Sequence, residues 1–377
     1  MNTQHMVSHE IPASPTTATD CRTVLMVGTD LSTKGGVRSV VQGYVEGGLF
    51  KRFDGQYIPT HCDGTLWDKA RAAVRGWLRA GIALARMESP LVHAHTSSRA
   101  SFWRKSGVFL MARAARRPYV IHMHGGEFMQ FYENECGAHT QRLIRHFLRE
   151  AALVLVLADQ WKERLQKICP DAKIEVLNNG VVLPDLQLRR EELRPSIVFL
   201  GNLARGKGIY DLLHAFARIA KRFPDVRLIC AGGGVVAQAR AMAARLDLEG
   251  RVEFTGWIDA ERKRHLLAGA TAFVLPTYAE GMPMALLEAM SWRLPVVTTP
   301  VGGVPQLVQH RSNGLLVAPG NIEQLAAALA EVLEDGALRR RLGSAARTTI
   351  EDRYCLEHSL EQLGRIYSRF GISETLK

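Results

Sequence analysis

The chain has 377 residues, of which 47% are hydrophobic and 23% are charged, and its formal net charge is +11. That length exceeds what one hydrophobic core usually supports, so we expect two globular domains and exclude a largely disordered chain. No stretch reaches the eighteen or more apolar residues that a membrane-spanning helix needs, so no such helix is expected.

The beginning of the chain and its cysteines point to the same compartment. Residues 1–20 lack the apolar core of a signal peptide, and we expect them to be a disordered leader on a cytosolic protein. The six cysteines are scattered, which fits a reducing environment and excludes the spacing of a structural zinc site. Residues 51–117 hold 13 Lys and Arg against 4 Asp and Glu, and this excess favours an anionic membrane surface, nucleic acid or phosphorylated substrate as partner.

Short apolar runs alternate with helical patterns, which is typical of βαβ units around parallel sheets. In the first half the predicted strands are Val24–Val27, Leu91–Ala94, Tyr119–His122 and Leu153–Val156. After a broken segment at 185–195, strands are predicted at 197–200, 228–230, 252–254, 272–275 and 295–297. The sequence therefore predicts an α/β protein with doubly wound, Rossmann-like domains at 21–187 and 195–377, whose C-terminal helix packs back on the first domain. Ligands of such sheets bind beyond the carboxyl ends of the strands.

The loop after the first predicted strand contains Lys34, Gly35 and Gly36 at the start of a helical pattern. Paired glycines allow the backbone to approach a phosphate closely. A plain tight turn fits the same residues, so this loop is a candidate site only in company with others.

Residues 69–82 have helical periodicity with two adjoining stripes. The basic stripe consists of Arg71, Arg75 and Arg79. The apolar stripe consists of Val74, Trp77, Leu78 and Ile82. Such a pair is typical of a helix that lies in a membrane interface. It fits equally well a helix whose apolar stripe packs on the core while its arginines are solvated, because periodicity alone does not say which face is buried.

The strand that ends at His122 is followed by Met123, His124 and Gly125. A histidine on a strand is more often a core residue, but His124 stands at the strand end, where ligands bind. His93 and His95 are assigned to the core, and residues 178–181 are assigned a structural turn.

A glycine-rich turn opens the second half, with Asn202, Arg205 and Lys207 between Gly201 and Gly208. A lysine beside the start of a helix can neutralise a diphosphate. The spacing nearly matches a P-loop, which makes a P-loop NTPase or kinase the alternative. Gly208 stands where that motif needs Ser or Thr to hold magnesium.

Two glutamates flank the start of a helix near residue 284: Glu280 lies in the loop after a strand, and Glu288 lies over a turn into the helix. One carboxylate can face a sugar while the other accepts hydrogen bonds from a ribose diol, with free helix amides between them. From spacing alone, an exposed loop acid and a solvated helical glutamate are the simpler interpretation.

The segment from Glu280 to Glu288 nevertheless resembles the Glu-(seven residues)-Glu signature of the family-four retaining GT-B glycosyltransferases, and companion segments agree with it in order. The resemblance runs from about Val24 to the C-terminus. It implies catalytic roles for Glu280 and His124. It implies donor-binding roles for Gly35, Gly36, Asn202, Arg205, Lys207, Trp257, Gly281, Met282, Pro283, Met284 and Glu288.

Residue 202 departs from the family pattern, because Asn202 stands where the family usually has arginine. Either Arg205 supplies the missing guanidinium, or phosphate binding relies on Lys207 and helix amides.

The resemblance implies a retaining hexosyltransferase that uses a nucleotide diphosphate sugar, with UDP or GDP as the nucleotide. The sequence contains no Asp-x-Asp pair, so we expect neither metal nor cofactor. The implied acceptor is a glycan, lipid-linked in polysaccharide or cell-envelope synthesis, which places the enzyme in the cytoplasm or on the inner face of the membrane. A GT-B nucleotide-sugar epimerase is a close alternative. A non-enzymatic nucleic-acid-binding protein is disfavoured, because aromatic residues do not interleave the basic ones.

Overall fold

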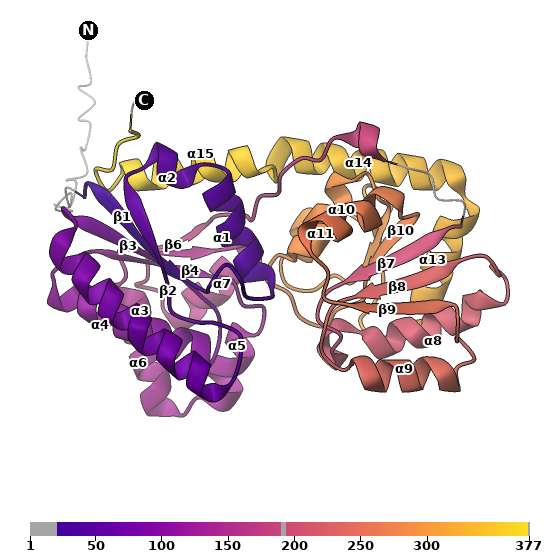
Figure 1. The fold of residues 1–377 in the computed structure, drawn as a ribbon, viewed down its shortest axis with the longest axis horizontal. Coiled ribbons are helices and arrows are strands. Elements are labelled where there is room, and N and C mark those ends of the chain that lie inside the picture. The colour runs from indigo at the N-terminus through magenta and orange to yellow at the C-terminus, as the bar shows by residue number, and fades with distance from the viewer. Residues whose placement is uncertain (1–20, 190–193, 376–377) are drawn as a thin grey trace, which may run out of the picture.

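The computed structural model describes residues 21–189 and 194–375, so the leader expected at 1–20 and residues 190–193 of the expected boundary lie outside it. Two parallel six-stranded sheets, each flanked by helices, form the two halves of the molecule (Figure 1). None of the helices in the described parts is long and apolar enough to cross a membrane.

The first sheet has the strand order β2-β1-β3-β4-β5-β6. Its strands are β1 (Thr23–Gly28), β2 (Gly55–Pro59), β3 (Pro90–Thr96), β4 (Tyr119–Met123), β5 (Leu153–Val156) and β6 (Ile174–Val176). The helices of this half are α1 (Gly36–Glu46), α2 (Leu49–Arg52), α3 (Leu66–Arg86), α4 (Ala100–Ala114), α5 (Phe128–Gln130) with a π-helical turn (Phe131–Glu135), α6 (Ala138–Glu150) and α7 (Asp159–Ile168).

The second sheet has the order β12-β11-β10-β7-β8-β9. Its strands are β7 (Ser196–Leu200), β8 (Arg227–Ala231), β9 (Val252–Gly256), β10 (Ala272–Leu275), β11 (Val296–Thr298) and β12 (Leu315–Leu316). The helices are α8 (Ile209–Ala220), α9 (Val236–Arg245), α10 (Ala260–Gly269), α11 (Met284–Ser291), α12 (Val304–Leu307), α13 (Ile322–Glu334), α14 (Gly336–Arg353) and α15 (Leu356–Ser368). Short 3-10 turns lie at Leu186–Leu188 and Arg205–Lys207.

The α/β prediction is confirmed, and the strands that it missed are instructive. β2, β6 and β12 each lie at the edge of a sheet. β2 begins at Gly55 and ends at Pro59, and β6 and β12 have only three and two residues. Edge strands are half solvated and bury fewer apolar side chains, so they lack the continuous apolar run of the central strands.

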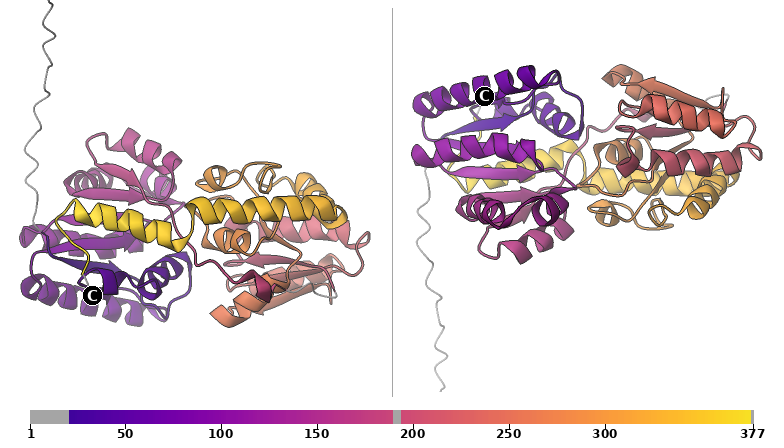
Figure 2. Two further views of the ribbon diagram at one scale, coloured as in Figure 1. Left: turned by 90° about the horizontal axis from the view of Figure 1, so that it is seen from above. Right: turned by 90° about the horizontal axis from the view of Figure 1, so that it is seen from below.

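The C-terminal helices join the two halves. α14 lies along the second half and α15 along the first, end to end (Figures 1 and 2). α15 buries Leu356, Leu360, Leu363 and Tyr367 in the core on one face of the first sheet. Where the chain returns, the backbone of Val181 exchanges hydrogen bonds of 2.9 Å with Tyr354 and Leu356. The two crossing segments thus lie side by side between the sheets.

Candidate donor-sugar site between the two sheets

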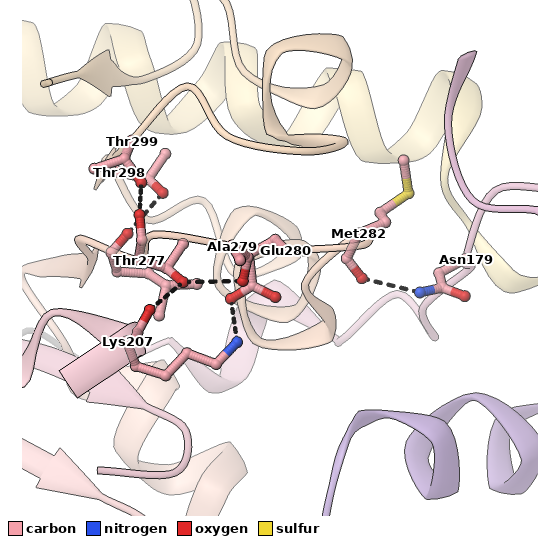
Figure 3. Close-up of polar contacts among 10 residues, drawn as sticks. Asn179, Lys207, Thr277, Ala279, Glu280, Met282, Thr298 and Thr299 are labelled. Atoms are coloured by element: carbon pink, nitrogen blue, oxygen red, sulfur yellow. Dashed lines mark hydrogen bonds and ion pairs between the residues drawn. The ribbon is translucent and has the colours of Figure 1, made fainter. Parts of the chain in front are cut away.

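The loop after β10 is held rigidly by buried threonines. Thr277, Thr298 and Thr299 are fully buried. The hydroxyl of Thr299 donates to the carbonyl of Thr277 at 2.5 Å, and the hydroxyl of Thr277 donates to the carbonyls of Gly206 and Ala279 (Figure 3). These bonds join the loop to the turn after β7, so that both approach the same point.

Glu280 and Lys207 meet at that point. Lys207 Nζ lies 2.5 Å from Glu280 Oε1, and the glutamate is 8% exposed (Figure 3). Gly208 has φ +71°, and a side chain there would collide with the carbonyl of Pro276, which explains why glycine follows the lysine. Both charged residues were predicted from the sequence, Lys207 as a ligand of the diphosphate and Glu280 as a ligand of the sugar, but their ion pair was not.

Glu288 lies on α11 and is also paired. Its Oε1 is 2.5 Å from Nζ of Lys263 on α10, and its side chain is 19% exposed. Lys263 was not predicted from the sequence, because it lies 25 residues from Glu288 in a helix that carries no motif. The position predicted to accept from a ribose diol is therefore occupied by a carboxylate whose charge is already neutralised.

The first sheet approaches this loop through backbone contacts. A Cβ built on Gly126 would lie 2.5 Å from the carbonyl carbon of Glu280, and one on Gly281 would lie 2.7 Å from the carbonyl oxygen of His124. His124, Gly125 and Gly281 line one small pocket. The two predicted catalytic residues thus come from opposite sheets to neighbouring positions.

His124 belongs to a stack of four histidines on β3 and at the end of β4. Its Nε2 lies 2.8 Å from His95 Nδ1, and His93 is bonded to His122 at 3.1 Å and to Tyr367 at 2.7 Å. Burial lowers the pKa of His93 and of His124 to about 3. Electrostatic repulsion by His93 and Lys105 adds to the effect at His124. The stack is therefore neutral at physiological pH.

Nitrogens of His93, His95 and His122 lie within 4.8 Å of one another, close enough to raise the question of a metal. Both nitrogens of His93 are, however, engaged by His122 and Tyr367. The rings of His93 and His95 stack at 15°, so their lone pairs lie in separate, nearly parallel planes and do not converge on one point as metal ligands must. This geometry favours a packed hydrogen-bonded stack.

The remaining predicted donor-binding residues surround the same region. Gly35 has φ +130° with open space around it, and Gly36 faces Met284 at the start of α11. Lys34 Nζ lies 5.8 Å from the ring of Trp257, which bridges the two halves. Met282 and Pro283 are buried, and the carbonyl of Met282 accepts from Asn179 at 3.0 Å. Asn202 and Arg205 are exposed at the rim.

This arrangement can hold an anion between a lysine, a glycine loop and the first amides of α11, beside a carboxylate. α11 begins after Pro283 with no side-chain cap, which leaves amide hydrogens free for a ligand. A group with a diphosphate and a polyhydroxylated ring matches these features.

The chain is similar in sequence to known proteins. A family model described as glycosyl transferases group 1 matches residues 186–349, and one described as glycosyltransferase family 4 matches residues 48–183. An alpha-D-kanosaminyltransferase from Streptomyces kanamyceticus is 27% identical over 326 residues, which cover 80% of this chain and 83% of the relative. The amylovoran biosynthesis glycosyltransferase AmsK from Erwinia amylovora is 30% identical over 231 residues, covering 58% of this chain and 56% of that protein.

Solved structures show the same fold. HepE from Anabaena, in complex with UDP and glucose, superposes with a TM-score of 0.71 at 20% identity and covers 91% of this chain and 99% of its own. Sucrose-phosphate synthase from Thermosynechococcus elongatus superposes with a TM-score of 0.73 at 19% identity, covering 92% and 99%. Both place the chain among two-domain α/β proteins of the GT-B fold.

Proposed function

This chain belongs to the group 1 glycosyl transferases, which transfer a sugar from a nucleotide-sugar donor; from that premise we propose a retaining, metal-independent hexosyltransferase. Its donor is a UDP or GDP sugar, and its acceptor is a lipid-linked glycan of polysaccharide or cell-envelope synthesis. The enzyme works in the cytoplasm, at the inner face of the membrane.

One observation carries the proposal for the donor: Lys207 and Glu280 form an ion pair at the meeting point of the two halves. Transfer develops negative charge on the leaving diphosphate and positive charge at the anomeric carbon. A diphosphate would compete for Lys207, because an ammonium binds phosphate oxygens strongly. Glu280 would then be released to accept hydrogen bonds from the sugar, so one ion pair is exchanged for two ligand contacts.

Charge on the leaving group is balanced by this chain's own residues. Lys207, the backbone of Gly35 and Gly36 and the amides of α11 surround the place where the diphosphate would lie. Preorganised donors of this kind stabilise developing negative charge without moving. His124, neutral through burial, contacts the sugar from the opposite half. With front-face attack, the anomeric configuration is retained.

The test is Glu280→Gln, compared with the exposed control Glu249→Gln. We expect nucleotide diphosphate affinity to persist while transfer falls at least about a hundredfold, since the carboxylate charge acts on the reacting sugar. Activity should survive EDTA, and NMR of the product should show retained anomeric configuration. An inverted product or a strict requirement for magnesium or manganese would contradict the proposal, and an epimerised donor without transfer would identify an epimerase.

The membrane-bound acceptor is supported by the orientation of α3. Most residues of its buried face are small, and they comprise Ala73, Gly76, Ala80 and Ala83, followed by Leu84. A Cβ on Gly76 would lie 2.7 Å from the carbonyl oxygen of Pro59, so the helix sits directly on the strand end. Of the apolar stripe of α3, Val74, Leu78 and Ile82 point away from the core, whereas Trp77 packs on α4. This orientation supports an interfacial helix.

The outer face of α3 combines apolar and basic side chains. Large apolar side chains are exposed to 84% at Leu66, 85% at Trp67, 51% at Val74, 64% at Leu78 and 52% at Ile82. The three arginines of the basic stripe are exposed beside them, and Asp68, the single acidic residue of the helix, closes a capping box with Thr65. Exposed apolar residues with a basic border suit insertion into an anionic bilayer.

Co-sedimentation with vesicles tests this surface. Vesicles of phosphatidylcholine with phosphatidylglycerol should bind the protein, and vesicles of phosphatidylcholine alone should bind it much less. Replacing Arg71, Arg75 and Arg79 by Gln should weaken binding by about 1 kcal/mol for each charge. The matched control replaces Arg222, Arg245 and Arg262 of the second half. An equal loss of vesicle binding in both triple variants would contradict the proposal that α3 is the docking surface.

A further inference from the structure

Three basic side chains gather beneath α3, where it meets α4 at the carboxyl edge of the first sheet. His61 follows β2, and Arg104 and Lys105 lie on α4 close enough to act electrostatically on it. Lys105 acts in the same way on His124. Trp77 of α3 donates from its indole nitrogen to the carbonyl of Arg104 at 2.8 Å, which fixes the two helices over this group.

Lys105 and Arg104 form no ion pair with a carboxylate among the described residues. The Lys105 side chain is almost completely buried, at 2% exposure, and no ion pair with it exists within residues 21–189 and 194–375. His61 Nδ1 and Arg104 Nε are buried without a hydrogen-bond partner in the same part of the chain. Asp63, the acidic residue near His61, already accepts from the amide of Lys34 at 3.0 Å.

An uncompensated buried lysine destabilises a fold. Burial, with a smaller contribution from the charge of Arg104, lowers the pKa of Lys105 to about 7. Lysines are almost never fully buried without a partner, because the ammonium loses its hydration. Methionine has a similar shape and no such cost, so a lysine at this position suggests that something outside the chain supplies the missing negative charge.

We propose that Lys105, Arg104 and His61 form a binding site for a phosphoryl group of the sugar acceptor. The site rests on the proposed transferase function, and it lies between His124, at the sugar end, and the outward apolar face of α3. A lipid-linked acceptor that reaches the sugar along α3 would bring its phosphate or diphosphate there. The bound anion would restore the charge of Lys105 and satisfy the free nitrogens of His61 and Arg104.

The binding test uses inorganic pyrophosphate in the full chain carrying Lys207→Met, so that the lysine of the donor loop is absent. Isothermal titration should detect a site that the additional change Lys105→Met weakens about tenfold or more, as expected for loss of a charged hydrogen bond. Lys221→Met, which removes an exposed lysine of the second half, is the matched control. Equal pyrophosphate affinity in the two double variants would overturn the proposal.

Thermal unfolding distinguishes a ligand site from a structural role. Lys105→Met should keep or raise the melting temperature, because it removes a buried charge without a partner, while it abolishes the stabilisation by pyrophosphate. A lower melting temperature would mean that the fold itself satisfies Lys105, and would overturn the site. Glucuronate that binds more tightly than pyrophosphate would overturn the phosphoryl assignment.

A separate measurement tests the proposed donor site. It compares the binding of UDP and of GDP to the wild type and to Lys105→Met. If neither nucleotide binds the wild type, the proposed function fails whatever pyrophosphate does at Lys105. If a nucleotide binds while Lys105→Met and Lys221→Met behave alike toward pyrophosphate, only the acceptor site fails.

Discussion

The two sheet edges that face each other differ in whether their charged groups are paired. In the second half, Lys207 pairs with Glu280 and Lys263 pairs with Glu288 at 2.5 Å each. In the first half, the histidines are neutral and Lys105 has no anionic partner among the described residues. Paired charges can exchange partners when a ligand arrives, whereas uncompensated groups gain a partner only from the ligand. The second edge is thus organised before the donor binds, and the first is completed by what binds it.

The largest effect is expected where the two edges touch. Gly126→Ala would place a methyl carbon 2.5 Å from the carbonyl carbon of Glu280, so one loop must move away from the other. A displacement near 1 Å at a reacting centre costs about a hundredfold in rate. Transfer by Gly126→Ala should fall by about that factor. Gly137→Ala, where no atom lies within 4 Å, is the control, and equal rates in the two variants would show that this contact is dispensable.

The ion pair between Lys263 on α10 and Glu288 on α11 tests whether paired charges at the edge of the second sheet exchange partners when the donor binds. Glu288→Ala should weaken nucleotide diphosphate binding by about 1.5–3 kcal/mol, the usual loss for a charged hydrogen bond. Lys263→Ala should weaken it less, because Lys263 orients Glu288 and does not itself touch the ligand. Calorimetry on both single variants and the double variant gives the coupling. Strictly additive losses would mean that the ion pair has no role in holding the carboxylate.

The buried, neutral histidines at the edge of the first sheet should make the stability of the protein depend on pH. The pKa of His93 and of His124 is about 3 in the native state and 6.5 in the unfolded chain, so the unfolded chain binds more protons between these values. The contribution of these histidines to the free energy of unfolding is therefore fully present above pH 6.5 and is lost as the pH drops toward 3. Urea unfolding at pH 7.5, 5.5 and 4.5 measures the slope, which His93→Gln should reduce. A flat profile would show that these histidines are not buried as neutral groups.

The smallest effect is expected at the rim of the donor loop. Arg205 is exposed, so solvent screens its attraction for a diphosphate to about 0–1 kcal/mol. Arg205→Ala should weaken nucleotide diphosphate binding only a few-fold, and Asn202→Arg in that variant should restore it. Wild-type affinity in Arg205→Ala would leave Lys207 and the helix amides as the phosphate ligands.

Much of the donor site was predictable because its residues follow strands. β4, β7 and β10 are apolar runs bounded by Gly or Pro, and the carboxyl ends of parallel strands gather at one edge of a sheet. This rule alone places His124 at the carboxyl edge of the first sheet and Lys207 and Glu280 at the carboxyl edge of the second. Resemblance to a family supplied their expected roles.

The sequence by itself determined the fold class, the central strands and the loops that carry the site, because periodicity and turn residues are local properties. The tertiary structure decided which groups pair and which face is buried. Lys263 meets Glu288 across two helices, and no spacing signals such a contact. Val74, Leu78 and Ile82 of α3 point outward, because Ala73, Gly76 and Ala80 allow a closer approach to the sheet than larger side chains would. A helical pattern indicates that the two faces of a helix differ in polarity, but only the neighbouring elements determine which face is buried.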